Sequence, residues 1–326
     1  MKNFSGLIDQ ATRSTHESLI QQLALFSEDR SRTRTEDISK QGDYPIFIRF
    51  IRNILVHLTV SSLHPGGTVD GFVVLLMALR LSGEGIDAWN QQAHQSDEIM
   101  PNILSYIRDH PPAIVLIDTQ APEFEHRTLC AGQGYSWGSV EKGNDAKNEF
   151  FISAELVEAY ICLEKARSGG SSLDPKDKNV LVFLQIVILV TTLHELAHCL
   201  TKWMFGSLIT PRLCFGGKKG EGGDVIERIL FDGILCIEWK RSDFNNRQLR
   251  MRTIKDLYLQ SSQEEHNGGF AIHKLALDDL ERTVNSIKSY RIYQPAYTLD
   301  EHGLSDCDIG SVDARCIRRQ ASSPAW

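Results

Sequence analysis

The sequence feature that most constrains the fold is a long apolar run that leads directly into two histidines and a glutamate. Residues 179–193 read NVLVFLQIVILVTTL, and the next five residues are HELAH. On a helix from about Asn179 to Met204, the apolar residues lie on every side. A helix that is hydrophobic all round belongs in the middle of a domain. We therefore expect the rest of the chain to pack around this helix.

The same run is expected to be a core helix rather than a membrane span. A spanning helix needs about 20 consecutive apolar residues. The run at 179–193 is shorter than this, because it ends at His194 and Glu195. The N-terminal residues lack the apolar segment of a secretory signal. Seven cysteines without a C-x-x-C pair are typical of reduced thiols. These features predict an intracellular, cytoplasmic protein that does not associate with membranes.

The charge of the chain argues against a nucleic-acid partner. The formal net charge is −7 for 326 residues, and a net-negative surface repels nucleic acids and anionic membranes unless a basic patch is set apart. The two short basic runs, at 31–36 and 247–252, have acidic residues nearby. We expect both runs to be solvated surface. The composition, with 42% hydrophobic residues, is ample for a packed core.

Apolar periodicity and breaker residues predict an α+β fold with two regions. Residues 1–111 are expected to be mostly helical, and residues 112–326 are expected to combine a small mixed sheet with helices around the apolar run. The predicted helices cover 15–26, 45–60, 68–81, 96–110, 154–167 and 224–231, with a last one beginning at His273. The predicted strands cover 113–118, 148–153 and 234–240.

The HELAH pentapeptide has the residue types and the spacing of a metal site. Residues four apart on a helix lie one turn above each other, so His194 and His198 can direct their imidazoles at one ion. Glu195 is rotated by about 100° and lies beside that ion, where a carboxylate can act as a general base. The alternative is a pair of buried histidines that bind nothing. We favour the metal site because burying this triplet without partners is costly.

HELAH, followed 23 residues after its second histidine by the glutamate of GEGG, resembles the gluzincin branch of zinc metallopeptidases. The segment from FFISAELVEAY to GEGGDVIERILFDG, within 148–240, is similar to zincin-like candidate metallopeptidases of filamentous fungi. The resemblance implies a zincin-like catalytic domain within 112–326, a Zn²⁺ cofactor and a peptide or amide substrate. His194 and His198 match the metal ligands, and Glu195 matches the catalytic glutamate.

The resemblance also implies a third ligand, a glutamate on a following helix. Glu221 is the favoured match, because it starts that helix and because Gly222 and Gly223 leave room for close approach to the HELAH helix. Glu227 is the rival, and Asp224 is a further alternative. If Glu221 is the ligand, Glu227 or Asp224 is expected to orient a histidine by accepting its other N–H.

We therefore predict a zinc-dependent hydrolase that cleaves peptide or amide bonds. Two alternatives stay open. Two histidines and a carboxylate also form the facial triad of non-haem Fe(II) enzymes, which would give oxidative or biosynthetic chemistry. A pseudoenzyme could keep the scaffold without the activity. The sequence leaves open the substrate and the oligomeric state.

No motif assigns the residue that stabilises the oxyanion. Tyr290, Tyr293, Tyr297 and His273 are the candidates, and none has a spacing that distinguishes it from a packing residue. The other histidines of the chain have no ligand spacing, and we expect most of them at the surface. Cys199 adjoins His198 but points away around the helix, and we expect it to pack as a small hydrophobe.

Overall fold

The structure is a computed structural model, and it describes residues 20, 23–28, 33–61, 68–81, 96–117, 138–140, 147–170, 172–205, 213–215, 218–220, 222–239, 254–264 and 270–288. Several predicted features lie outside these residues. They are the favoured ligand Glu221, the three tyrosine candidates Tyr290, Tyr293 and Tyr297, and the basic run 247–252.

Helix α7 (Pro175–Phe205) is the apolar run, and it is the central element of the fold. It packs against α6 (Ala154–Ser168), α8 (Gly222–Phe231) and α10 (Leu277–Lys288), and it contacts strands of two sheets. The helix begins four residues earlier than predicted, because Pro175 suits the first helical position and Asp174 accepts a hydrogen bond from the Asp177 N–H at 2.6 Å. The predicted burial of this helix is confirmed.

By length and composition α7 could cross a membrane, and among the described residues it is the helix that meets both criteria. At 31 residues it is longer than the sequence predicted. In the fold, however, 94% of its most apolar window is buried inside the protein. Its burial, and not its length, is therefore what favours a core helix.

A four-stranded sheet lies beside α7, with the strand order β1-β2-β4-β3. Strands β1 (Leu25–Glu28), β2 (Ala113–Ile117) and β4 (Glu149–Ser153) are parallel, and β3 (Gly138–Ser139) pairs antiparallel with β4 at the edge. Nearly every residue of β2 and β4 is buried. The predicted strands at 113–118 and 148–153 are confirmed.

The helices predicted in the first region are confirmed as α2 (Tyr44–Ser61), α3 (Thr68–Leu81) and α5 (Ser96–Asp109). The helix predicted over 15–26 is wrong at its end, because residues 25 and 26 belong to β1 and pair with Ile114 and Val115. The long-range pairing with β2 overrides a local amphipathic pattern there. The helical first region thus also supplies a strand to the sheet.

A second sheet and a hairpin complete the second region. The sheet is antiparallel, with β7 (Gly233–Trp239), β8 (Ile254–Glu264) and β9 (Phe270–Lys274) in that order, and the hairpin joins β5 (Leu213–Phe215) to β6 (Lys218–Gly220). The C-terminal helix predicted from His273 begins instead at Leu277, because residues up to 274 pair with β8. Helix α6 is capped by the Ser153 Oγ, which accepts a hydrogen bond from the Leu156 N–H at 3.4 Å.

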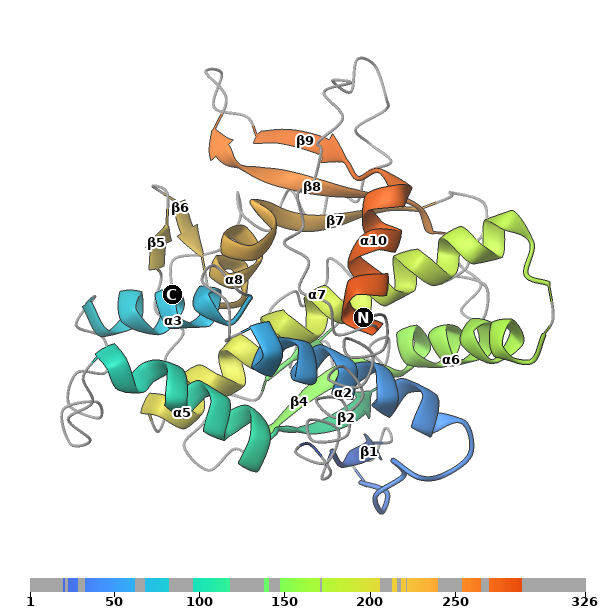
Figure 1. The fold of residues 1–326 in the computed structure, drawn as a ribbon, viewed down its shortest axis with the longest axis horizontal. Helices are drawn as coiled ribbons and strands as arrows, with labels where there is room; N and C mark the ends of the chain where they lie inside the picture. Colours follow the sequence, from blue (N-terminus) through green and yellow to red (C-terminus); the bar gives the residue numbers. More distant parts are fainter. Residues whose placement is uncertain are drawn as a thin grey trace, which may run out of the picture.

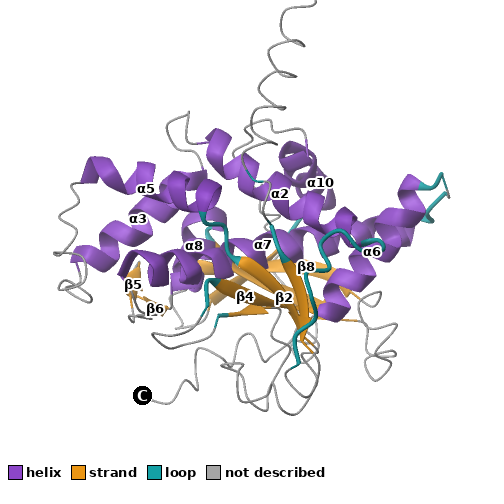
Figure 2. Cartoon of the chain, turned by 90° about the horizontal axis from the view of Figure 1, so that it is seen from below, coloured by secondary structure: helices purple, strands orange, loops and turns teal. Residues whose placement is uncertain are grey.

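The elements form layers around α7. Figure 2 shows the helices gathered along one side of the sheet that holds β2 and β4. In Figure 1, the three-stranded sheet lies above α7 and α8, and helix α2 lies below them. The predicted α+β class is confirmed by this arrangement.

Arg34, in the first basic run, is not the solvated side chain that we expected. Its guanidinium donates two hydrogen bonds of 2.7 Å to the carboxylate of Glu149 on β4, and its side chain is 23% exposed. Glu28 on β1 lies 3.6 Å from the same guanidinium. The prediction failed because a buried carboxylate far along the chain attracts this arginine, and a local charge pattern does not reveal that partner.

His57 on α2 also differs from the prediction of surface histidines, because it is 7% exposed. Its Nε2 lies 3.5 Å from the Thr68 hydroxyl at the start of α3. Burial lowers the pKa of His57 to about 4, since the charged imidazolium is poorly solvated there. His57 is therefore neutral in the folded protein at pH 7.

We expect the stability of the protein to fall as the pH drops below about 6.5. The unfolded chain binds a proton at His57 near its ordinary pKa of 6.5, whereas the folded protein does so only near 4. The free energy of unfolding is therefore unaffected by His57 above pH 6.5 and falls progressively between pH 6.5 and pH 4. At pH 5 the loss due to His57 is about 2 kcal/mol. Urea unfolding at pH 7.5 and pH 5 measures the loss. The loss of stability between pH 7.5 and pH 5 should be smaller in His57→Phe. It should be unchanged in His110→Gln, which alters an exposed histidine. Equal losses in the two variants would contradict the role of His57.

Candidate metal centre

Helix α7 brings the two histidines and the glutamate of HELAH together inside the protein. The imidazole rings of His194 and His198 have centroids 5.2 Å apart and meet edge to face at 60°. The His194 side chain is 17% exposed, whereas His198 and Glu195 are 6% and 4% exposed. The predicted one-turn juxtaposition is confirmed, on a helix that the core holds rigidly.

Glu227, from α8, contacts His194 in the way expected of an orienting residue. Its Oε1 lies 2.8 Å from the Nδ1 of His194, and its Oε2 accepts the backbone N–H of Leu235 on β7 at 2.9 Å. With the Nδ1–H directed at the carboxylate, the lone pair of His194 is on Nε2. Both Glu227 oxygens are thus engaged, which favours the orienting role over that of the rival third ligand.

The two glycines at the start of α8 allow this helix to lie directly on the histidines, as the sequence predicted. A Cβ added to Gly223 would lie 2.2 Å from both Nε2 and Cδ2 of His194, well inside van der Waals contact. A Cβ added to Gly222 would meet nothing closer than 3.9 Å, with the Nδ1 of His198 among its nearest atoms. The close packing that needs glycine is therefore at position 223.

Gly138 on the edge strand β3 is a residue of the site that the sequence did not reveal. A Cβ there would lie 2.7 Å from Cγ and 2.8 Å from Oε1 of Glu195. The strand is placed by its pairing with β4, where Gly138 is opposite Ile152. Its position over Glu195 depends on a sheet contact, and one glycine in a stretch without clear periodicity gives no signal of it.

Cys199 packs away from the histidines, and this prediction is confirmed. Its side chain is 2% exposed, and its Sγ donates to the backbone oxygen of Glu149 at 3.6 Å. Burial raises the pKa of this thiol well above its ordinary value, which disfavours the thiolate that would bind a metal.

The described residues supply only part of a ligand set. Within them, no three His, Cys, Asp or Glu side chains form a group that could hold a metal ion. The third position belongs to Glu221 in our prediction, and that residue lies outside the described part. Asp224 is half-buried on α8, and the oxyanion candidate His273 is on β9, opposite Leu259 of β8.

Two of the described side chains have donors of the kind that zinc binds. The two imidazoles lie next to each other on one helix, and the Glu227 carboxylate fixes the tautomer of the first. Glycines face the His194 ring and Glu195 at the two points where a larger residue would overlap them. This is the donor set and the outer support that zinc sites use.

No protein-family model, curated protein or solved structure matches this chain. What the site can do therefore follows from its own side chains and their geometry.

Proposed function

We propose that the protein is a zinc-dependent hydrolase that cleaves peptide or amide bonds. The observation that carries the proposal is the hydrogen bond between His194 Nδ1 and Glu227, which holds one of two adjacent imidazoles in the tautomer with its lone pair on Nε2. His194 and His198 would hold the zinc, with Glu221 as third ligand. The finer fold assignment, a zincin-like catalytic domain, belongs to the same proposal.

The residues of the site have separate roles in this proposal. Zinc, when bound, would act as a Lewis acid that polarises a carbonyl group and lowers the pKa of a water molecule. Glu195 accepts the proton of the attacking water and passes it to the leaving amine, because it is the carboxylate next to the first histidine. Glu227 keeps His194 oriented throughout. Gly138 and the strand β3 shield one side of Glu195.

Metal analysis of the purified full-length protein tests the proposal. We expect about one zinc per chain, lost in His194→Ala and in His198→Gln, and retained in His110→Gln, where the histidine is exposed and on another element. Incubation with a mixed synthetic peptide library, followed by mass spectrometry, should then show zinc-dependent cleavage.

Two results would contradict the proposal. One is zinc that stays bound in both histidine variants while circular dichroism shows that they are folded. The other is iron in anaerobically purified protein, together with turnover that depends on O₂, which would instead support the facial-triad alternative.

A further inference from the structure

Arg228 on α8 carries a buried positive charge that the described part of the protein does not neutralise. The residue is 5% exposed, and Nε and both terminal nitrogens of its guanidinium are buried. None of these three nitrogens has a hydrogen-bond partner among the residues that the structure describes. A guanidinium stays protonated in proteins and has five N–H donors. Its burial is therefore costly unless an anion binds to it.

The carboxylates that are nearest to Arg228 in the sequence do not pair with it. Both oxygens of Glu227 are engaged, one by His194 Nδ1 and the other by the backbone N–H of Leu235. Asp224 and Asp232 are four residues before and after Arg228, and neither accepts a hydrogen bond from its guanidinium. Asp232 lies past the end of α8 and is exposed, whereas Arg228 is buried. The charge of Arg228 is thus available to a ligand.

We propose that Arg228 binds a carboxylate of the peptide substrate, an inference that rests on the proposed hydrolase function. Arg228 directly follows Glu227, whose Oε1 lies 2.8 Å from His194 Nδ1. Successive helical residues are about 100° apart, which places Arg228 on the flank of α8 beside the face that contacts the histidine. An extended peptide spans about 3.3 Å per residue. A carboxylate at Arg228 is therefore within a few residues of a bond held at the histidine pair.

A carboxylate matches this side chain in shape as well as in charge. The planar guanidinium can donate two parallel N–H bonds to the two oxygens of one carboxylate. Such charge-assisted bonds are stronger in a buried site, where water does not compete for the donors. A peptide supplies the group either at its C-terminus or in an aspartate or glutamate side chain. We therefore expect the protein to select peptides that carry a carboxylate near the cleaved bond.

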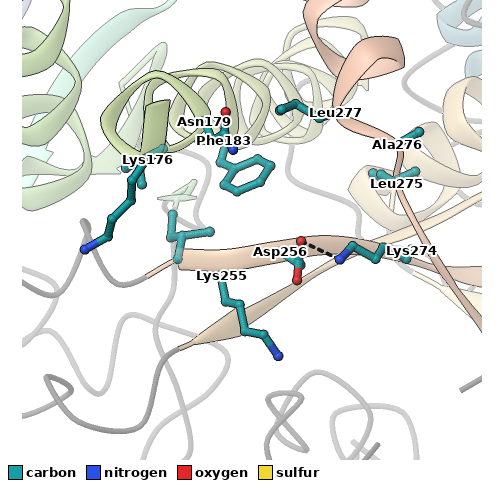
Figure 3. A pocket seen from close by; sticks show the side chains of 11 residues that line it. Lys176, Asn179, Phe183, Lys255, Asp256, Lys274, Leu275, Ala276 and Leu277 are labelled. Atoms are coloured by element: carbon teal, nitrogen blue, oxygen red, sulfur yellow. Dashed lines mark ion pairs between the residues drawn. The ribbon is translucent and has the colours of Figure 1, made fainter. Parts of the chain in front are cut away.

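The pocket near the opposite end of α7 does not offer this chemistry. It has a volume of about 330 Å³ and lies between the first turns of α7, the start of β8 and the segment that joins β9 to α10 (Figure 3). Lys274 Nζ is paired with the Asp256 carboxylate at 2.8 Å. In Figure 3, the amines of Lys176 and Lys255 point away from the Phe183 ring. The lysines that line this pocket therefore do not direct charge at its apolar wall.

Equilibrium dialysis of a mixed synthetic peptide library against the full-length protein tests the inference. The library is made with a free C-terminal carboxylate and with a C-terminal amide, and a second set has glutamine and asparagine in place of the acidic residues. Full-length Glu195→Gln is the protein used, because it should bind peptides without cleaving them. We expect peptides with a carboxylate to be retained about tenfold or more over their neutral counterparts. Comparison of the sets shows whether the C-terminus or a side chain supplies the carboxylate.

Two substitutions of Arg228, made in the same protein, test whether this residue causes the selection. Arg228→Met removes the charge and should abolish the preference. Arg228→Lys keeps the charge but cannot form two parallel bonds, so part of the preference should remain. Because the charge lacks a partner, ligand-free Arg228→Met should have a Tm at least as high as its parent. Arg49→Met, at an exposed arginine on α2, is the control and should change neither quantity.

Equal retention of acidic and neutral peptides overturns the inference, and this comparison needs no Arg228 variant to fold. A preference that persists in Arg228→Met also overturns it. A Tm lowered by several degrees in Arg228→Met overturns it as well, because Arg228 would then be paired within the protein. Zinc content and cleavage are separate measurements. A protein without zinc that still selects carboxylates through Arg228 would contradict the proposed function and leave Arg228 as the carboxylate site.

Discussion

Replacing Glu195 by glutamine is expected to reduce peptide hydrolysis by about 10²- to 10⁴-fold while zinc binding is retained. Glutamine has nearly the same shape and fits the space between α7 and Gly138, but its amide cannot accept the proton of the attacking water. Because Glu195 is not one of the ligands in the proposed zinc site, the zinc content should remain at the wild-type value. The ratio kcat/KM on a peptide found in the library screen is the quantity to compare.

The control for this prediction is Glu158→Gln, which makes the same chemical change at an exposed position on α6. That variant should keep wild-type turnover. Full activity in Glu195→Gln would show that Glu195 is not the general base. Loss of zinc together with activity would instead show that Glu195 holds the metal or supports its ligands.

Gly223→Ala is expected to disrupt the site through His194. The new methyl group would lie 2.2 Å from Nε2, so either α8 must move away or the imidazole must rotate and lose its 2.8 Å contact with Glu227. Loss of such an orienting contact typically weakens metal binding by about 10- to 100-fold. Overpacking should also lower the free energy of unfolding by about 1–3 kcal/mol. Competition with a zinc chelator and urea unfolding measure the two effects.

Gly222→Ala is the matched control, one residue earlier on the same helix. Its methyl group would have ordinary contacts, the nearest at 3.9 Å, and neither glycine has a positive φ. We expect its zinc affinity and stability to stay close to the wild-type values. Equal behaviour of the two variants would show that α8 does not rest on His194 as closely as the structure has it.

Much of the local structure could be predicted because it depends on neighbouring residues. Helices α2, α3, α5 and α6 follow from apolar periodicity and from signals such as the Ser153 cap. Three of the failures have a related cause. Residues 25 and 26, Arg34 and His273 are each placed by a partner on another strand, on β2, β4 and β8, and the partners of the first two lie far along the chain. Local patterns carry no information about such partners.

The sequence by itself determined the motif and the burial of its helix. Spacing puts His194 and His198 on one face, and an apolar run long enough to be hydrophobic on all sides has to lie in the core. The sequence also identified the two glycines that let a second helix approach. It favoured Glu221 over Glu227 as the third ligand, but residue spacing alone could not give either carboxylate a partner.

Only the tertiary structure decided how the carboxylates and glycines are used. The packing of α8 on α7 brings Glu227 to the Nδ1 of His194, and the start of β7 supplies the backbone N–H that occupies its other oxygen. The pairing of β3 with β4 puts Gly138 against Glu195. The contact of Glu227 with His194 joins residues 33 apart, and that of Gly138 with Glu195 joins residues 57 apart. Their geometry depends on how whole elements pack, which residue spacing alone does not specify.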